Sequence, residues 1–183
     1  MTAIEARHDV EQVYSRPHAE LMRWLDEHGR VYEVIDGAVV VNPPPGFAHQ
    51  DVLGELFVQL RAAAPPGHRV IWFYGFEYVP GSWVEPDIAV LPPGDYVGSL
   101  HGVPPILAVE ATSPSTRRTD EGRKKEIYGD GGVPTYWLAE PEEPRLRVLE
   151  LRAGEYVETA LVGAGELLEI QQPYPMTVRL ART

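Results

Sequence analysis

The chain has 183 residues, of which 44% are hydrophobic and 23% are charged, so we expect one globular domain over residues 1–183, with residues 1–15 as a flexible N-terminus. It contains no cysteine, which excludes disulfide bonds, thiolate zinc sites and iron–sulfur clusters. The formal net charge of -11 argues against sequence-independent coating of DNA or of acidic membranes, so any contact with nucleic acid has to be local.

The first part of the chain is predicted to form a helix, a hairpin and a second helix. Apolar residues recur at helical spacing over residues 16–29, a stretch that ends at a glycine. Residues 31–42 hold two apolar runs joined by Asp36 and Gly37, a pair that accepts the positive backbone angles of a tight hairpin turn. Residues 48–64 place apolar side chains on one helical face, which predicts a helix that covers a sheet. These side chains are Val52, Leu53, Leu56, Phe57 and Leu60.

The middle of the chain is predicted to be rich in strands. Apolar runs at residues 70–79, 87–91 and 106–111 are each bounded by proline or glycine, and we expect three successive strands. The polar segment 113–132 predicts a charged helix with a glycine stop. Residues 133–139 predict a short buried strand.

The last segment, residues 145–180, is predicted to hold two or three strands and no helix. It includes a hairpin around Ala153 and Gly154. The order of elements therefore predicts an α+β fold with one central mixed sheet and a strand-rich C-terminal tail.

Several familiar sequence signatures are absent. The glycine-rich loops of mononucleotide and dinucleotide sites are missing, as are the G-x-S-x-G elbow and the H-E-x-x-H helix. No apolar run reaches the roughly 18 residues needed to cross a bilayer. We therefore expect a cytoplasmic protein with no membrane partner.

Two acidic residues interrupt apolar strands and are the main chemical signal. Asp87 begins one predicted strand and Glu110 lies near the end of the next, so antiparallel pairing of these strands would set the two carboxylates side by side. An unpaired carboxylate in a central strand is costly unless a positive charge compensates it. Mg²⁺ binds one or two carboxylates and keeps positions open for water and phosphate. The pair predicts a Mg²⁺ site, with Mn²⁺ as a substitute, whereas the alternative is that each acid caps a turn or pairs with an arginine.

The helix that follows offers groups that attract phosphate. Strand alternation places Thr112 on the face of Glu110, and Lys124 and Tyr128 share a helix face at i, i+4 spacing. Five basic residues cluster here, and we expect a phosphate-binding patch that faces the two acids. They are Arg117, Arg118, Arg123, Lys124 and Lys125. The alternative is a solvated helix face.

With these residues the sequence resembles the Uma family, a bacterial group of restriction-endonuclease-like proteins in the PD-(D/E)XK nuclease superfamily. The resemblance runs in order through most of the chain. Its pieces are Tyr-Glu-Val-Ile-Asp-Gly at 32–37, Ala-His-Gln at 48–50, Val-Glu-Pro-Asp-Ile-Ala-Val at 84–90, Val-Glu-Ala-Thr-Ser-Pro-Ser-Thr at 109–116, Lys124 to Tyr128, and Gly-Val-Pro-Thr-Tyr-Trp-Leu at 132–138. The resemblance implies a restriction-endonuclease-like α-β-β-β-α-β core, with an N-terminal helix and hairpin ahead of it.

The resemblance also implies roles for individual residues. Asp87 and Glu110 would be the metal ligands. The superfamily usually has a lysine two positions after the glutamate, where this sequence has Thr112. The family resembled here moves that lysine to the next helix, and Lys124 matches its position.

Two further residues match recurrent positions of the family, and a third differs from the residue that the family usually has. Glu33 matches one and would support the metal or the attacking water, or else is a surface strand acid. His49 matches another and would touch phosphate or hold a carboxylate, or else is a helix cap. Glu140 stands where the family more often has aspartate, and a purely structural role is the alternative.

The implied activity is that of a Mg²⁺-dependent endodeoxyribonuclease, which hydrolyses phosphodiester bonds in duplex DNA. Lys124 would orient the attacking water and stabilise charge on the phosphate. The substrate-binding residues would be His49, Thr112, Arg117, Arg118 and Tyr128. Because the protein is acidic, a homodimer that sets two patches along one duplex is one way to hold DNA.

Two other functions compete with this one. The first is a catalytically degenerate nuclease fold that binds nucleic acid or a protein partner, an alternative that Thr112 keeps open. The second is a carboxylate-pair hydrolase that acts on sugars without a metal, which the basic helix disfavours.

Overall fold

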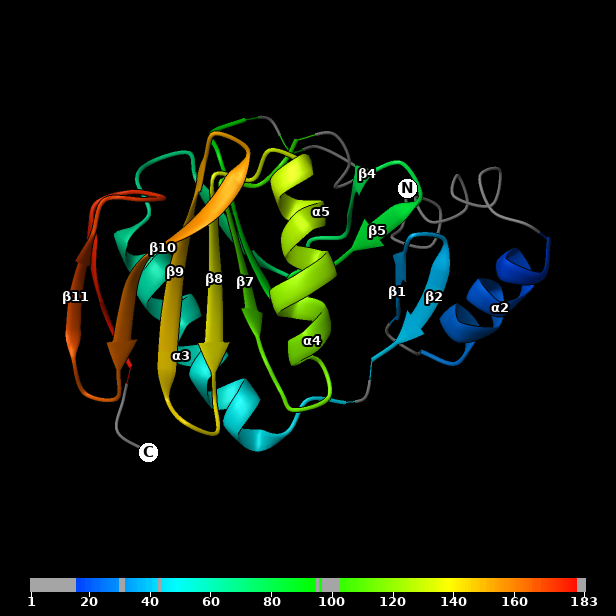
Figure 1. Cartoon of the computed structure of the whole chain (residues 1–183), viewed down its shortest axis with the longest axis horizontal. Helices are drawn as coiled ribbons and strands as arrows, with labels where there is room; N and C mark the ends of the chain where they lie inside the picture. The colour runs from blue at the N-terminus through cyan, green and yellow to red at the C-terminus, as the bar shows by residue number, and fades with distance from the viewer. Residues whose placement is uncertain (1–15, 30–31, 43, 95, 97–102, 181–183) are drawn as a thin grey trace.

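The computed structural model describes most of the chain. Its described residues are 16–29, 32–42, 44–94, 96 and 103–180. The expected flexible segment at residues 1–15 lies outside them. Within the described ranges, no helix combines the length and the apolar character that a bilayer crossing requires. A large sheet lies at one side of the molecule, and a small sheet lies at the other beside helix α2 (Arg16–Glu27) (Figure 1).

The large sheet has six strands in the order β10-β9-β8-β7-β6-β3. β7 and β8 run parallel, and every other neighbouring pair runs antiparallel. The strands are β3 (Arg69–Trp72), β6 (Ile88–Leu91), β7 (Leu107–Ala111), β8 (Thr135–Glu140), β9 (Arg145–Arg152) and β10 (Glu155–Gly163). The predicted α+β fold with a mixed central sheet is confirmed.

The small sheet has four antiparallel strands in the order β2-β1-β5-β4. They are β1 (Tyr32–Ile35), β2 (Ala38–Val41), β4 (Phe76–Val79) and β5 (Ser82–Val84). The turn between β1 and β2 has φ of 51° at Asp36 and 81° at Gly37, the two positive angles of a tight hairpin turn. The predicted hairpin is confirmed, whereas β5 is a strand that the sequence did not predict.

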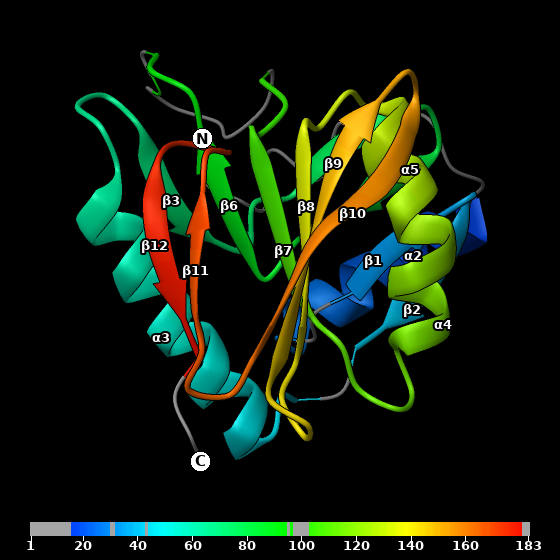
Figure 2. The same cartoon turned by 60° about the vertical axis from the view of Figure 1, so that its left-hand side comes forward.

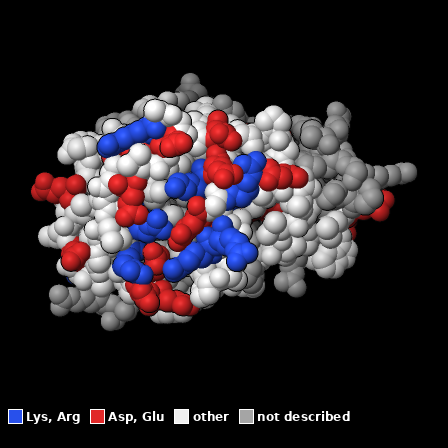
Figure 3. Space-filling model, viewed as in Figure 1, with Lys and Arg blue, Asp and Glu red and all other residues white. Residues whose placement is uncertain are grey.

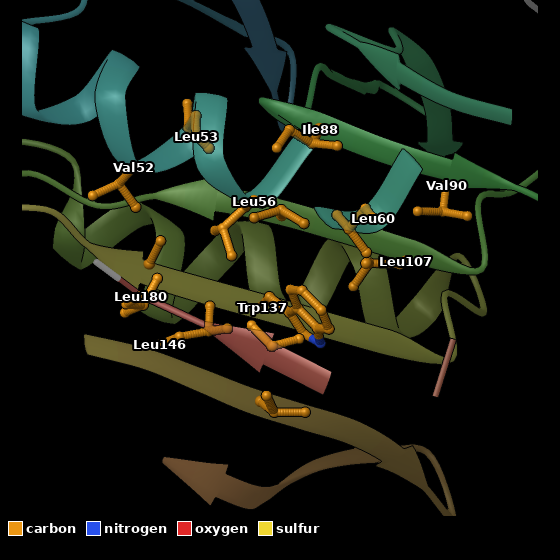
Figure 4. Close-up of a cluster of buried hydrophobic side chains, with 14 of the residues drawn as sticks. Val52, Leu53, Leu56, Leu60, Ile88, Val90, Leu107, Trp137, Leu146 and Leu180 are labelled. Atoms are coloured by element: carbon orange, nitrogen blue, oxygen red, sulfur yellow. The ribbon is translucent and has the colours of Figure 1, made fainter. Parts of the chain in front are cut away.

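Helix α3 (Phe47–Ala63) covers one face of the large sheet (Figure 2). Its buried residues recur at helical spacing because one apolar stripe faces the strands. They are Val52, Leu53, Leu56 and Leu60, and they pack on side chains of β6, β7, β8 and β9 (Figure 4). The prediction of a covering helix is confirmed.

The opposite face is covered by one helical stretch with three parts (Figure 2). These are α4 (Arg117–Thr119), the π-helical turn η2 (Asp120–Lys124) and α5 (Lys125–Asp130). Ile127 and Tyr128 are fully buried in a core cluster that contains Ala108 of β7. Ala108 and Glu110 therefore face this helix, since side chains two apart on a strand share a face.

The predicted strand at residues 70–79 is wrong, because the segment forms two strands in different sheets. β3 ends at Trp72 in the large sheet, the chain turns at Phe73 with φ of 50°, and β4 begins at Phe76 in the small sheet. Both halves are apolar, so local hydrophobicity predicts one long strand. The choice of sheet depends on hydrogen-bonding partners that are distant in sequence.

The C-terminal segment forms four strands, one more than the most that we expected. β9 and β10 make the predicted hairpin, with positive φ at Ala153 and Gly154. β11 (Leu167–Ile170) and β12 (Met176–Arg179) form a separate two-stranded sheet.

Candidate active site

The antiparallel pairing of β6 and β7 brings the two predicted acids together. The register pairs Ile88 with Val109, so one step further along the ladder Asp87 stands opposite Glu110. The backbone N–H of Ala111 donates a 2.8 Å hydrogen bond to Oδ2 of Asp87. The expectation that these two strand ends lie beside each other is confirmed.

Glu110 is a buried carboxylate with two close partners. It is 4% exposed, and its Oε1 accepts a 2.6 Å hydrogen bond from the hydroxyl of Tyr128. The same oxygen lies 2.6 Å from Nζ of Lys124. Burial raises the pKa of Glu110 well above its ordinary value, against the opposing charge of Lys124, and the neighbouring charge of Asp87 raises it further. Burial therefore disfavours the charged form of this carboxyl group, and Lys124 partly offsets that effect.

Lys124 is the cation that the protein itself supplies to these acids. Its ammonium group lies 2.9 Å from Oε1 of Glu33 and 3.9 Å from Oδ1 of Asp120, in addition to its contact with Glu110. Burial alone would lower the pKa of Lys124, but the surrounding carboxylates outweigh it and raise the pKa above its ordinary value. Lys124 therefore stays protonated. It lies at the end of the π-helical turn η2, an irregularity that is often found at functional sites.

Glu33 holds Lys124 in place from the small sheet. Its side chain is buried, and its Oε1 accepts a 2.9 Å hydrogen bond from the backbone N–H of Glu85. Its Oε2 accepts a 3.1 Å hydrogen bond from Nδ2 of Asn42. Both oxygens are thus occupied by donors of the protein. The geometry matches support of the lysine better than direct contact with a metal.

Asp120 completes the buried cluster and was missed in the sequence. It is 4% exposed, and burial raises its pKa to about 6 although the charge of Lys124 opposes this shift. Asp120 stands four residues before Lys124, the spacing that puts both side chains on one helix face. That spacing was the signal that could have found it. Asn42 was also missed, and no local pattern marks it.

His49 reaches Asp87 from the first turn of α3. Its Nε2 lies 3.5 Å from Oδ2 of Asp87, and the two side chains are 22% and 16% exposed, so the cluster meets solvent here. Burial would lower the pKa of His49, but its contact with Asp87 outweighs this effect and raises the pKa. Of its two expected roles, the geometry matches holding a carboxylate.

Thr112 turns toward the backbone of β8. It is buried, and its Oγ1 donates a 3.3 Å hydrogen bond to the carbonyl oxygen of Ala139. Its backbone N–H donates to the same oxygen at 2.8 Å. The hydroxyl is therefore engaged away from Lys124, although the residue occupies the position of the usual superfamily lysine.

Basic residues of the predicted patch form ion pairs with several acids. Arg117 pairs with Glu140 at 3.0 Å, and Arg123 pairs with Asp36 at 2.6 Å. Basic and acidic groups are interspersed over this face of the protein (Figure 3). Arg118 is exposed, and Lys124 is the member of the patch that contacts the buried acids. Glu140 has an ion-pairing role, since Arg145 also contacts it at 3.2 Å.

The donor set at the strand ends fits a hard divalent cation. Asp87 and Glu110 offer two carboxylates, and within the described residues no three His, Asp or Glu side chains form a fuller ligand set. Mg²⁺ and Mn²⁺ accept such partial oxygen sets and complete them with water or phosphate.

Comparison with known proteins identifies the family. A family model described as "Uma2: Putative restriction endonuclease" matches residues 18–183. Among solved structures, "a putative nuclease belonging to DUF820" from Anabaena variabilis ATCC 29413 matches with a TM-score of 0.63 and 19% identity, over 76% of this chain and 81% of that chain. At this identity the likeness shows the fold, which is restriction-endonuclease-like. No match was found among curated proteins. Since the family model covers nearly the whole chain, the protein belongs to the Uma2 family.

Proposed function

We propose that the protein is a metal-dependent endonuclease that hydrolyses phosphodiester bonds in DNA, with Mg²⁺ as its cofactor and Mn²⁺ as a substitute. The observation that carries the proposal is that Asp87, just before β6, stands opposite Glu110 of β7, and that Glu110 lies 2.6 Å from the ammonium group of Lys124. Membership in a family described as "Putative restriction endonuclease" supports nucleic acid as the substrate class.

In this mechanism Asp87 and Glu110 would hold the metal. When bound, such an ion polarises a phosphoryl oxygen and lowers the pKa of a coordinated water. His49 orients Asp87 through the 3.5 Å contact, and Tyr128 orients Glu110 through the 2.6 Å hydrogen bond. The two ligands are therefore held in position before substrate binds.

Lys124 acts as a fixed positive charge. Because the surrounding carboxylates raise its pKa, it does not serve as a general base at neutral pH. It stabilises negative charge that develops on the phosphate and orients the attacking water. Glu33 and Asp120 are positioning residues, since their contacts with the ammonium group fix where that charge lies.

DNA binding in this proposal does not depend on the basic patch. The expectation of a homodimer along a duplex needs free basic groups that release counterions from phosphates. Arg117 and Arg123 are instead paired with acids. We therefore propose DNA as the substrate and do not include a homodimer along a duplex.

Cleavage assays on the full chain test the proposal. We expect wild-type protein to convert supercoiled plasmid to nicked and linear forms with Mg²⁺ or Mn²⁺, and EDTA to stop the reaction. Asp87→Asn should abolish cleavage, whereas Glu155→Gln, a change at an exposed acid on β10, should retain it. Absence of metal-dependent cleavage by the wild type, or full activity of Asp87→Asn, would overturn the proposal.

A second candidate is a nuclease fold without catalysis. It is favoured by the engagement of Thr112 with β8 and by the ion pairs of Lys124, which already compensate part of the buried negative charge. Titration calorimetry with Mn²⁺ separates the two candidates. Metal binding that depends on both Asp87 and Glu110 supports the endonuclease, and no metal binding supports the inactive module.

A further inference from the structure

Three aromatic rings lie together at the edge of the large sheet. Trp72 is the last residue of the edge strand β3, and Phe73 follows it. Trp72 stacks on Phe57 of α3 with a centroid distance of 4.3 Å and an interplanar angle of 11°, and the ring of Phe73 lies 6.2 Å from that of Trp72. We call this group the aromatic ledge; it consists of Phe57, Trp72 and Phe73. Trp72 is 39% exposed and Phe73 is 52% exposed, so the ledge offers ring surface to solvent.

The aromatic ledge is joined to the candidate active site through the backbone. The N–H of Phe73 donates a 3.3 Å hydrogen bond to the carbonyl oxygen of Asp87. Trp72 is paired with Ile88, the residue after Asp87, in the ladder between β3 and β6. Neighbouring strands lie about 4.8 Å apart, so the ledge begins one strand away from the proposed metal ligand. The base next to a phosphate bound at Asp87 would therefore come within reach of these rings.

Phe73 combines a strained backbone conformation with an exposed ring. Its φ of 50° lies in the left-handed region, which bulky side chains rarely adopt. Residues held in such conformations cluster at functional sites. A large ring also gains free energy when it is buried, yet Phe73 is half exposed. The ring is thus available to a ligand.

The charge of the protein favours a ligand held by stacking. The net charge of -11 repels a polyanion, and the ion pairs of Arg117 and Arg123 with acids weaken their attraction for phosphate. Aromatic side chains stack on bases of any sequence, and this contact does not depend on attraction between charges. In an intact duplex the faces of the bases are already covered by their neighbours. An aromatic surface beside a scissile phosphate therefore selects an unpaired base.

We propose that the aromatic ledge binds an unpaired nucleobase beside the scissile phosphate, so that the preferred substrate is single-stranded or locally unpaired DNA. This inference rests on the proposed function and specifies its substrate. Phe73 provides the exposed ring, and Trp72, which stacks on Phe57, lies beside it at an interplanar angle of 36°.

Binding of labelled oligonucleotides to the full chain tests the ledge without cleavage. The probes are a single-stranded oligonucleotide that contains 2-aminopurine and its duplex, both in EDTA. We expect tighter binding of the single strand, with a change in 2-aminopurine fluorescence that reports stacking. Phe73→Gly removes the ring and accepts a positive φ. It should weaken single-strand binding by about tenfold, whereas Phe73→Trp should retain binding. Leu167→Ala, a change at an exposed apolar residue of β11, is the control and should bind as the wild type does.

Cleavage by the same variants in Mg²⁺ separates failure of the ledge from failure of the proposed function. If the wild type cuts DNA and Phe73→Gly binds and cuts equally well, the ledge is overturned and the endonuclease stands. Tighter binding of the intact duplex than of the single strand also overturns the proposal that the ledge binds an unpaired base. If the single strand binds through Phe73 but is never cut, the ledge is supported and the endonuclease fails. If the wild type neither binds nor cuts DNA, both are overturned.

Discussion

The ammonium group of Lys124 lies 2.6 Å from a carboxylate oxygen of Glu110, and both side chains are buried. Glu110 belongs to strand β7. Lys124 belongs to the π-helical turn η2, which covers the sheet face that Glu110 occupies. Thr112, two positions after Glu110, is turned toward β8 instead. The lysine beside the buried glutamate therefore comes from the covering helical stretch and not from position 112, two residues after Glu110.

Removal of this lysine should destabilise the fold as well as stop catalysis. Lys124→Met leaves Glu110, Glu33 and Asp120 without their shared cation, and loss of one partner of a buried ion pair costs about 3–5 kcal/mol. Urea unfolding at pH 7 should show this loss of stability. The double variant Lys124→Met/Glu110→Gln should recover part of it while staying inactive. A single variant as stable as the wild type would contradict the contacts described for Lys124.

Glu33 and Asp87 should differ in their effect on metal binding. Asp87→Asn removes a proposed ligand and should weaken Mn²⁺ binding more than tenfold, since even supporting residues of metal sites contribute about tenfold. Glu33→Gln should leave Mn²⁺ affinity nearly unchanged but lower kcat, because Lys124 loses the charge that holds it. Titration calorimetry and single-turnover cleavage measure the two quantities. Weaker Mn²⁺ binding by Glu33→Gln would make Glu33 part of the metal site.

Asp120 should make stability depend on pH. Its pKa is raised from 3.8 to about 6 by burial, so the folded protein binds this proton more tightly than the unfolded chain does. Its stabilising contribution is therefore complete below pH 3.8 and is lost as the pH rises to about 6. The shift corresponds to about 3 kcal/mol.

Comparison with Asp120→Asn isolates this effect from those of other titrating groups. The difference in unfolding free energy between the two proteins, measured with urea from pH 5 to pH 7, should move in favour of the variant as the pH rises. A difference that stays constant over this range would show that Asp120 does not titrate there.

A core substitution separates loss of stability from loss of function. Leu56 of α3 is fully buried against the large sheet (Figure 4). Leu56→Ala should lower the free energy of unfolding by about 2–5 kcal/mol, through lost burial and the cavity that remains. At temperatures where the variant is still folded, its affinity for Mn²⁺ should match that of the wild type, because Leu56 packs in the core cluster under α3 whereas Glu110 bonds Tyr128 of the other helical stretch. Unfolding in urea and calorimetry provide the two measurements.

Elements with strong local signals could be predicted from the sequence. The turn at Asp36 and Gly37 needs two residues that accept positive φ, and α3 shows its apolar stripe in the spacing of Val52, Leu56 and Leu60. The sequence predicted the neighbourhood of the two acids on the condition that their strands pair antiparallel, and β6 and β7 do so. In these cases the physical cause lies within a few residues of its effect.

Tertiary structure alone decided how the site is completed. Glu33 meets Lys124 because the small sheet lies beside the helical stretch, and Asn42, the residue after β2, donates a hydrogen bond to Glu33. Pairing with distant strands also divided residues 70–79 between two sheets, with Phe73 at the turn between them. Such contacts join groups far apart in the chain. Their free energy depends on which surfaces pack together, and no local sequence pattern records that.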